Sequence, residues 1–198
     1  MRTADSNNPT CKGSGLPGAR PLRLTGADAL ARQLEQAIAA GDGLAGAHCI
    51  HELWMRGALA LNIESALERL WKSAAASIPA WLPMRHIEWL ELVYEVSARF
   101  LAQRRGRFNL YLVLLDYRDS RPDDYGIYVG GTRYPIAARF EQHKAGIRAA
   151  GSVLKRGLEL LPGPTLHLQN ISRADAQDIE ERLAEALRAA GLLVQGGH

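Results

Sequence analysis

The sequence predicts an α+β protein in which a helical half is followed by a small α/β half built on a short, mainly antiparallel sheet. Apolar residues recur with helical periodicity through residues 25–103, and all four tryptophans lie there. A β-type apolar run then opens the second half at residues 109–116, and five of the six tyrosines follow residue 104. The 198 residues suit one domain of ordinary size or two small ones.

Four helices are expected in the first half. Their predicted ranges are residues 27–40, 44–61, 63–78 and 84–103. Thr25 is suited to cap the first helix and Gly41 to end it. Pro79 and Pro83 separate the third helix from the fourth. We expect the tryptophans to be mostly buried, because they are large core-filling side chains.

The second half mixes strands with helices. Strands are expected at residues 109–116, 126–129 and 192–194, and helices at residues 134–150 and 173–190. Ser172 and Asp175 come close to a capping box at the start of the last helix. The run Pro162-Gly163-Pro164 predicts a stretch without regular structure.

Two boundaries divide the chain into three predicted segments. Residues 1–24 are interrupted by glycines and prolines, which predicts a flexible arm. The basic run Arg104-Arg105-Gly106-Arg107 then marks a junction. It separates an all-helical domain at 25–103 from an α/β domain at 104–198.

Charge and cysteine content narrow the class of protein. Residues 104–156 contain eleven basic and five acidic residues, an excess of +6 in a chain whose net charge is +3. A basic island suits phosphate backbones, but on charge alone a solvated basic surface is the favoured interpretation. Cys11 and Cys49 are too few for a disulfide scaffold and predict a reducing, cytoplasmic setting. The polar start and the lack of a long apolar run predict neither a secretory signal nor a membrane span.

Motifs of other enzyme classes are missing or incomplete. His48 and His51 could share a helix face beside Cys49, but zinc needs three or four ligands and no further one is near. We therefore expect these to be ordinary buried or half-buried helix residues. The phosphate-binding patterns GxxxxGK[ST] and GxGxxG do not occur, nor do HExxH and CxxC.

Polar residues in the second half form an ordered set. Asn109-Leu110-Tyr111 lies at the start of the first expected strand, and Tyr128-Val129-Gly130 lies on the second. Arg139 and His143 follow at i, i+4 spacing, so they share one face of the next helix. Glu180 comes later, on the last long helix.

This set resembles the GIY-YIG nuclease family over residues 108–198. The family pattern is two tyrosine motifs on a hairpin, a helix with an arginine and often a histidine one turn later, and a glutamate on a later helix. The letters Gly-Ile-Tyr also occur at residues 126–128, but no Tyr-x-Gly follows them before the arginine helix. We therefore take Tyr111 and Tyr128 as the motif tyrosines.

The chain departs from the family pattern in three ways. The first motif reads Asn-Leu-Tyr, and Tyr111 and Tyr128 are 17 residues apart, which implies an insertion between the strands. Gln195 stands 15 residues after Glu180, about where the family has an asparagine. That substitution puts the asparagine's role in doubt.

The resemblance implies a GIY-YIG-type endonuclease, a hydrolase that cleaves phosphodiester bonds in DNA with Mg²⁺ (or Mn²⁺), and RNA stays open as a substrate. Glu180 would hold the metal, since one carboxylate with water ligands suits Mg²⁺. Arg139 would bind phosphate. Tyr111 would act as base or position the water, with Tyr128 and His143 orienting water or phosphate. In the basic island, the expected nucleic-acid contacts are Arg133, Lys144, Arg148, Lys155 and Arg156.

Helical spacing separates the two adjacent acids of the last helix. Glu180 shares a stripe with the small Ala176 and with Leu183, so it should face the site. Glu181 aligns with charged residues and should be exposed.

Two other classes of function remain open. One is a catalytically silent nucleic-acid-binding module that keeps the fold. The other is an interaction protein whose helical half, with a net charge of −3, binds a protein partner. In the nuclease interpretation, the helical half is a structural, dimerising or target-selecting part that takes no share in catalysis.

Overall fold

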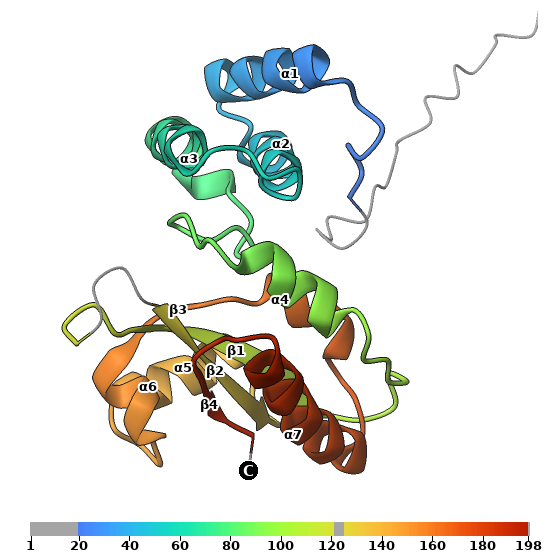
Figure 1. The fold of residues 1–198 in the computed structure, drawn as a ribbon, viewed down its shortest axis with the longest axis vertical. Coiled ribbons are helices and arrows are strands. Elements are labelled where there is room, and N and C mark those ends of the chain that lie inside the picture. Colours follow the sequence, from blue (N-terminus) through green and yellow to red (C-terminus); the bar gives the residue numbers. More distant parts are fainter. Residues whose placement is uncertain (1–19, 121–124, 198) are drawn as a thin grey trace, which may run out of the picture.

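The computed structural model describes residues 20–120 and 125–197. Helices α1–α4 come first, and a four-stranded sheet with further helices follows (Figure 1). The sheet is mixed and mostly antiparallel, because one of its three strand pairs is parallel. The predicted α+β class, with helices before the sheet, is confirmed at this level.

The helical half contains α1 (Ala27–Ala40), α2 (Gly43–Trp54), α3 (Ala60–Ala74) and α4 (Leu90–Ser97), with a short 3₁₀ turn, η2 (Ala75–Ser77), after α3. The first helix has its predicted bounds, and its N-cap is Gly26 rather than Thr25. The second and fourth are shorter than predicted. A turn at Gly57, whose φ is +69°, follows α2. His167 binds the carbonyl oxygen of Ser97, the last residue of α4, and that of Phe100.

The sheet has the order β3-β1-β2-β4. Its strands are β1 (Asn109–Asp116), β2 (Tyr125–Thr132), β3 (Gly157–Leu160) and β4 (Val194–Gly196). The two strands that carry Tyr111 and Tyr128 pair antiparallel along their whole length. The hairpin expected for the tyrosine strands is therefore present, with residues 121–124 of its connection outside the described residues.

Helices cover both faces of this sheet. The helices are α5 (Ile136–Lys144), α6 (Gly151–Arg156) and α7 (Arg173–Ala189), with a 3₁₀ segment, η3 (Gly163–Leu168). Ser172 caps α7 by accepting a hydrogen bond from the Asp175 N–H, as predicted. The single helix predicted over 134–150 is wrong, because the chain turns at Gly146 and Arg148, both with positive φ. Pro162-Gly163-Pro164 leads into η3, so that prediction is also wrong.

One apolar core runs through both halves. Leu90 and Val93 of α4 belong to the same buried cluster as Leu110 of β1 and Leu183 of α7. In Figure 1, α4 accordingly lies between α1–α3 and the sheet. Trp54 and Trp81 are buried, whereas Trp71 and Trp89 are half-buried against this core. A polar contact also joins the halves, since the buried Glu159 accepts hydrogen bonds from the Met84 N–H and from Arg85.

Part of the predicted arm is held against the helices. The carboxylate of the buried Glu52 pairs with Arg20 at 2.9 Å and with Arg56 at 2.7 Å. Arg56 also donates to the carbonyl oxygens of residues 22, 23 and 25. Residues 20–24 are thus anchored rather than free, and the rest of the predicted arm, 1–19, lies outside the described residues. No helix in the described ranges is both long and apolar enough to span a bilayer.

Candidate active site

The two motif tyrosines lie on one face of the sheet. In the pairing of β1 with β2, Tyr111 is opposite Gly130 and Tyr128 is opposite Val113. The phenol rings are therefore diagonal neighbours, with centroids 5.9 Å apart. A Cβ at position 130 would lie 2.6 Å from the Tyr128 ring and 2.8 Å from the Tyr111 hydroxyl oxygen. The glycine of Tyr-Val-Gly thus makes room for both rings.

His143, on α5, contacts Tyr111 from above the same sheet face. Its Nε2 atom is 2.8 Å from the Tyr111 hydroxyl oxygen, and its Nδ1 atom accepts a 2.9 Å hydrogen bond from the Ala150 N–H. Burial, with the charge of Arg139, lowers the pKa of His143 to about 4, so the ring is neutral at neutral pH. Nδ1 then carries no hydrogen, and Nε2–H must be the donor to Tyr111.

Arg139 lies one helical turn before His143 and closes the following loop. Its guanidinium donates to the carbonyl oxygens of Ile147, at 3.3 Å, and Arg148, at 2.8 Å. Burial raises the pKa of Tyr111, and Tyr128 adds to that rise, whereas the positive charge of Arg139 opposes it. The guanidinium therefore faces the tyrosine pair while it holds the loop.

Glu180 reaches the site from α7, which packs on the other face of the sheet. The edge strand β4 pairs with β2 only from Ile127 to Val129. Just beyond that pairing, the Gly131 N–H donates a hydrogen bond to the Glu180 carboxylate. The charge of Glu180 adds to the burial that raises the pKa of Tyr128, so the carboxylate lies near this phenol as well. Because β4 does not extend along β2 as far as Gly131, the Glu180 carboxylate on one face of the sheet can reach the end of β2, near the tyrosines on the other face.

The electrostatic state of Glu180 is unusual for a carboxylate. Burial raises its pKa to about 7, although the hydrogen bond from Gly131 opposes the rise. On the same helix, Ala176, Leu183 and Leu187 are buried, and Glu181 is exposed. The helical stripe predicted from the sequence is confirmed, since it placed Glu180 inward and Glu181 in solvent.

The groups present fit a divalent cation bound through a single carboxylate. Within residues 20–120 and 125–197, no basic side chain pairs with Glu180, and no cluster of three or more His, Cys, Asp or Glu residues forms a metal site. Mg²⁺ (or Mn²⁺) prefers oxygen ligands and retains several of its waters. A half-buried carboxylate that is not neutralised by a neighbouring cation supplies such a ligand, so Glu180 is the residue that would hold the ion.

The five basic residues expected to contact nucleic acid divide into two groups. Arg133 and Arg148 are exposed, and the pKa of Tyr134 is lowered first by a hydrogen bond from Arg133 and then by the charges of both arginines. Lys144 is exposed at the end of α5, with its ammonium group over the Phe140 ring.

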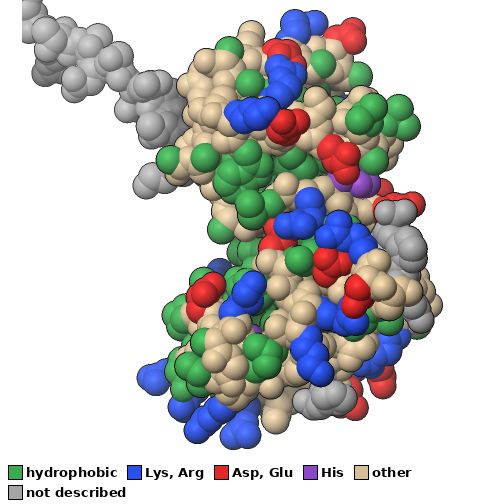
Figure 2. Space-filling view, turned by 90° about the vertical axis from the view of Figure 1, so that its left-hand side faces the viewer, with side chains coloured by type: hydrophobic (Ala, Val, Ile, Leu, Met, Phe, Trp, Pro, Cys, Tyr) green, Lys and Arg blue, Asp and Glu red, His purple; other side chains and the backbone are tan. Residues whose placement is uncertain are grey.

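The second group lies near the other end of β1. Arg156 bonds to the Asp116 carbonyl oxygen at 2.8 Å and pairs with Asp119, so it is engaged within the fold. Lys155 beside it is exposed. Arg118, too, pairs with Asp116. Figure 2 shows many Lys and Arg side chains on one face of the sheet-containing half.

The structure adds contributors that the sequence did not single out. They are Gly131, which seats the Glu180 carboxylate, and the Ala150 N–H, which fixes the His143 tautomer. Asn109, which stands in the first motif, has a local role: its side chain donates to the Tyr134 carbonyl and accepts from the Asn170 N–H. Gln195 is the β4 residue paired with Tyr128 in register, and it is half-buried.

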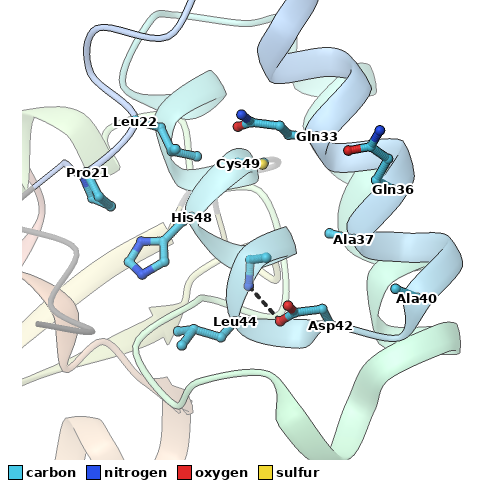
Figure 3. A pocket seen from close by; sticks show the side chains of 11 residues that line it. Pro21, Leu22, Gln33, Gln36, Ala37, Ala40, Asp42, Leu44, His48 and Cys49 are labelled. Atoms are coloured by element: carbon cyan, nitrogen blue, oxygen red, sulfur yellow. Dashed lines mark hydrogen bonds between the residues drawn. The ribbon is translucent and has the colours of Figure 1, made fainter. Parts of the chain in front are cut away.

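Another pocket lies between α1 and α2 and contains none of the predicted site residues. It has a volume of about 590 Å³ and is lined by residues that include Leu22, Leu44, His48 and Cys49 (Figure 3). Burial raises the pKa of Cys49 to about 11, so the thiol is protonated at neutral pH. His51 is buried between the rings of Trp81 and Tyr94. In the described ranges His48, Cys49 and His51 belong to no group of three or more His, Cys, Asp or Glu residues that could hold a metal ion.

Comparisons with protein-family models, with curated proteins and with solved structures found no match.

Proposed function

We propose that the protein is a metal-dependent endonuclease that hydrolyses phosphodiester bonds in DNA. The observation that carries the proposal is the meeting of four kinds of group around one end of the β1–β2 hairpin. Two tyrosines, a neutral histidine and an arginine approach from one face. From the other comes a half-buried carboxylate that has no cationic partner among the described residues.

Each group suits one requirement of the reaction. Hydrolysis of a phosphodiester needs a placed water, neutralisation of the phosphate charge and stabilisation of the leaving oxygen. When bound at Glu180, Mg²⁺ or Mn²⁺ would supply a positive charge for the leaving group. Arg139 presents a planar set of donors that matches phosphate oxygens. The tyrosine hydroxyls provide oxygen atoms that can orient a water.

The surroundings of the site supply attraction for a polyanion. Exposed Arg133, Arg148 and Lys144 flank α5, the helix that carries Arg139 and His143. Charges in this position attract the nucleic-acid backbone without reading sequence, so binding should weaken as salt rises.

The test is cleavage by the purified full-length chain. Supercoiled plasmid, duplex and single-stranded oligonucleotides and an RNA of the same sequence are incubated with Mg²⁺, Mn²⁺ or EDTA. We expect nicking or cutting of DNA that requires the metal and that Glu180→Gln abolishes, whereas Glu181→Gln leaves it intact. Salt-sensitive binding without cleavage on any substrate would favour the catalytically silent module instead. Cleavage of RNA alone would replace DNA as the substrate.

A further inference from the structure

The two motif tyrosines differ sharply in their access to a substrate. Tyr111 is only 1% exposed and packs in a buried cluster with Val113, Leu115 and Val153. Tyr128 is half-buried on β2 and lies beside Glu180. A group that handles a reacting proton must come within roughly 3 Å of it, or be one water away. Of this pair, Tyr128 has the more exposed side chain and is therefore better placed to meet that condition.

The hydrogen bonds at the Tyr111 hydroxyl have a direction. Because the Ala150 N–H occupies Nδ1 of His143, the Nε2–H of His143 donates to the Tyr111 oxygen. The other polar neighbour on α5, Arg139, can only donate. The Tyr128 phenol, whose ring centroid is 5.9 Å from that of Tyr111, is the neighbouring group toward which the Tyr111 hydroxyl can turn its hydrogen.

We infer that Tyr128 is the tyrosine that contacts the attacking water or the phosphate, and that His143 and Tyr111 are positioning residues that donate in sequence toward it. This inference rests on the proposed function, and it differs from the motif resemblance in placing Tyr111 and His143 behind Tyr128 rather than in contact with the water or phosphate. Each donor stabilises negative charge on the next oxygen, so charge that develops on the Tyr128 oxygen is supported by Tyr111, and that on Tyr111 by His143.

The first experiment compares Tyr128→Phe with Tyr111→Phe in the full chain. With Mg²⁺ and a labelled duplex, Tyr128→Phe should lower kcat by about a hundredfold or more with KM little changed, because a group in contact with the reacting atoms is lost. Tyr111→Phe should lower kcat by about tenfold, since it removes one hydrogen bond that acts through Tyr128. A larger kcat loss in Tyr111→Phe than in Tyr128→Phe would overturn the inference. Thermal unfolding of each variant accompanies the kinetics.

The second experiment tests the direction of the chain with two side chains of similar size. His143→Gln keeps an N–H donor and should retain cleavage within about tenfold of the original chain, the effect of one strained hydrogen bond. His143→Glu offers only acceptor oxygens when ionised, so it should lose most of kcat. Equal rates in these two variants would contradict a donated hydrogen bond from residue 143.

Two measurements do not depend on activity. The ¹⁵N shifts of the His143 ring should report a hydrogen on Nε2, and a hydrogen on Nδ1 would overturn the inference. Nitration with tetranitromethane, followed by peptide mass spectrometry, should modify Tyr128 before Tyr111, and the reverse order would also overturn it. If the unmodified chain cuts no nucleic acid, the proposed function fails, while these two readouts still decide the arrangement of the tyrosines.

Discussion

The carboxylate of Glu180 is seated directly against the backbone of Gly131. The Oε2 atom lies 2.6 Å from the place that a Cβ at residue 131 would occupy, and the Gly131 N–H donates to the same carboxylate. This seat buries an acid that no cation among the described residues neutralises, which explains its raised pKa. It also makes Glu180 sensitive both to pH and to any side chain at position 131.

The stability of the fold should fall as pH rises through the titration of Glu180. Its pKa is about 7 in the folded chain against 4.5 as its ordinary value, so between these values the folded state holds a proton that the unfolded state has lost. Glu180→Gln should remove this fall. After discounting for solvent screening, the variant should be more stable than the original chain above pH 7 by about 1–2 kcal/mol.

Urea unfolding below pH 4.5 and above pH 7 checks this prediction. The free energies of unfolding of the original chain and of Glu180→Gln should be nearly equal at the lower pH and should differ at the higher pH. Glu181→Gln is the matched control, because its side chain is exposed on the same helix. An advantage of Glu180→Gln that is the same at both pH values would show that its cause is packing rather than ionisation.

Mg²⁺ should stabilise the folded chain above pH 7, and Gly131→Ala should weaken that effect. A ligand at a hundred times its Kd adds about 2.7 kcal/mol to the free energy of unfolding. The methyl group that this substitution adds would displace the carboxylate, so we expect a metal affinity at least about tenfold lower, equivalent to about 1.4 kcal/mol. Isothermal titration of the metal into the full chain measures it.

Gly151→Ala is the control for this experiment, because a Cβ at residue 151 meets no atom within 4 Å. It should bind Mg²⁺ as the original chain does. Unchanged binding in Gly131→Ala would show that Glu180 does not hold the ion in its present seat.

Arg139→Lys should loosen the loop between α5 and α6. The guanidinium reaches the carbonyl oxygens of Ile147 and Arg148 together, and a lysine ammonium cannot reproduce that planar geometry. Loss of these bonds should lower the free energy of unfolding by about 1–2 kcal/mol. It should also speed hydrogen exchange at the Ala150 amide, which donates to His143. Arg148→Ala is the control, because it keeps the backbone acceptor and should leave the exchange rate of the Ala150 amide unchanged. Equal protection of this amide in the two variants would refute this role for Arg139.

Sequence patterns predicted best where a local rule decides the structure. The apolar run at 109–116 located β1 with its bounds, and Ser172 with Asp175 located the start of α7. The stripe of Leu183 and Leu187 separated Glu180 from Glu181 because helical spacing fixes which neighbours share a face. These predictions needed no knowledge of contacts distant in the chain.

Predictions failed where distant residues or single backbone angles decide. Gly146, with a φ of +76°, follows the end of α5 and is a local stop signal that the helix predicted over 134–150 ignored, whereas nothing local marks the left-handed conformation of Arg148. The end of α4 depends on His167, which is 70 residues away from Ser97 in the chain. The seat of Glu180 at Gly131 depends on where β4 stops pairing, which the short strand does not reveal in the sequence.

The last prediction concerns the division into a helical and an α/β domain. Glu159 on β3 accepts from the Met84 N–H at 3.0 Å and from Arg85 at 2.7 Å. Glu159→Ala leaves a part-buried N–H and a guanidinium without their acceptor, so it should lower the free energy of unfolding by about 2–3 kcal/mol. Glu159→Gln retains one acceptor oxygen and should cost about half as much.

Because α4 shares its buried cluster with α7 and β1, the two halves should also unfold together. All four tryptophans lie in residues 25–103, so their fluorescence reports on the helical half, while the circular dichroism of the whole chain includes the sheet. We expect the two signals to change at the same urea concentration, and both to shift equally in Glu159→Ala. Separate transitions would mean that the halves fold independently and that the shared core is too weak to couple them.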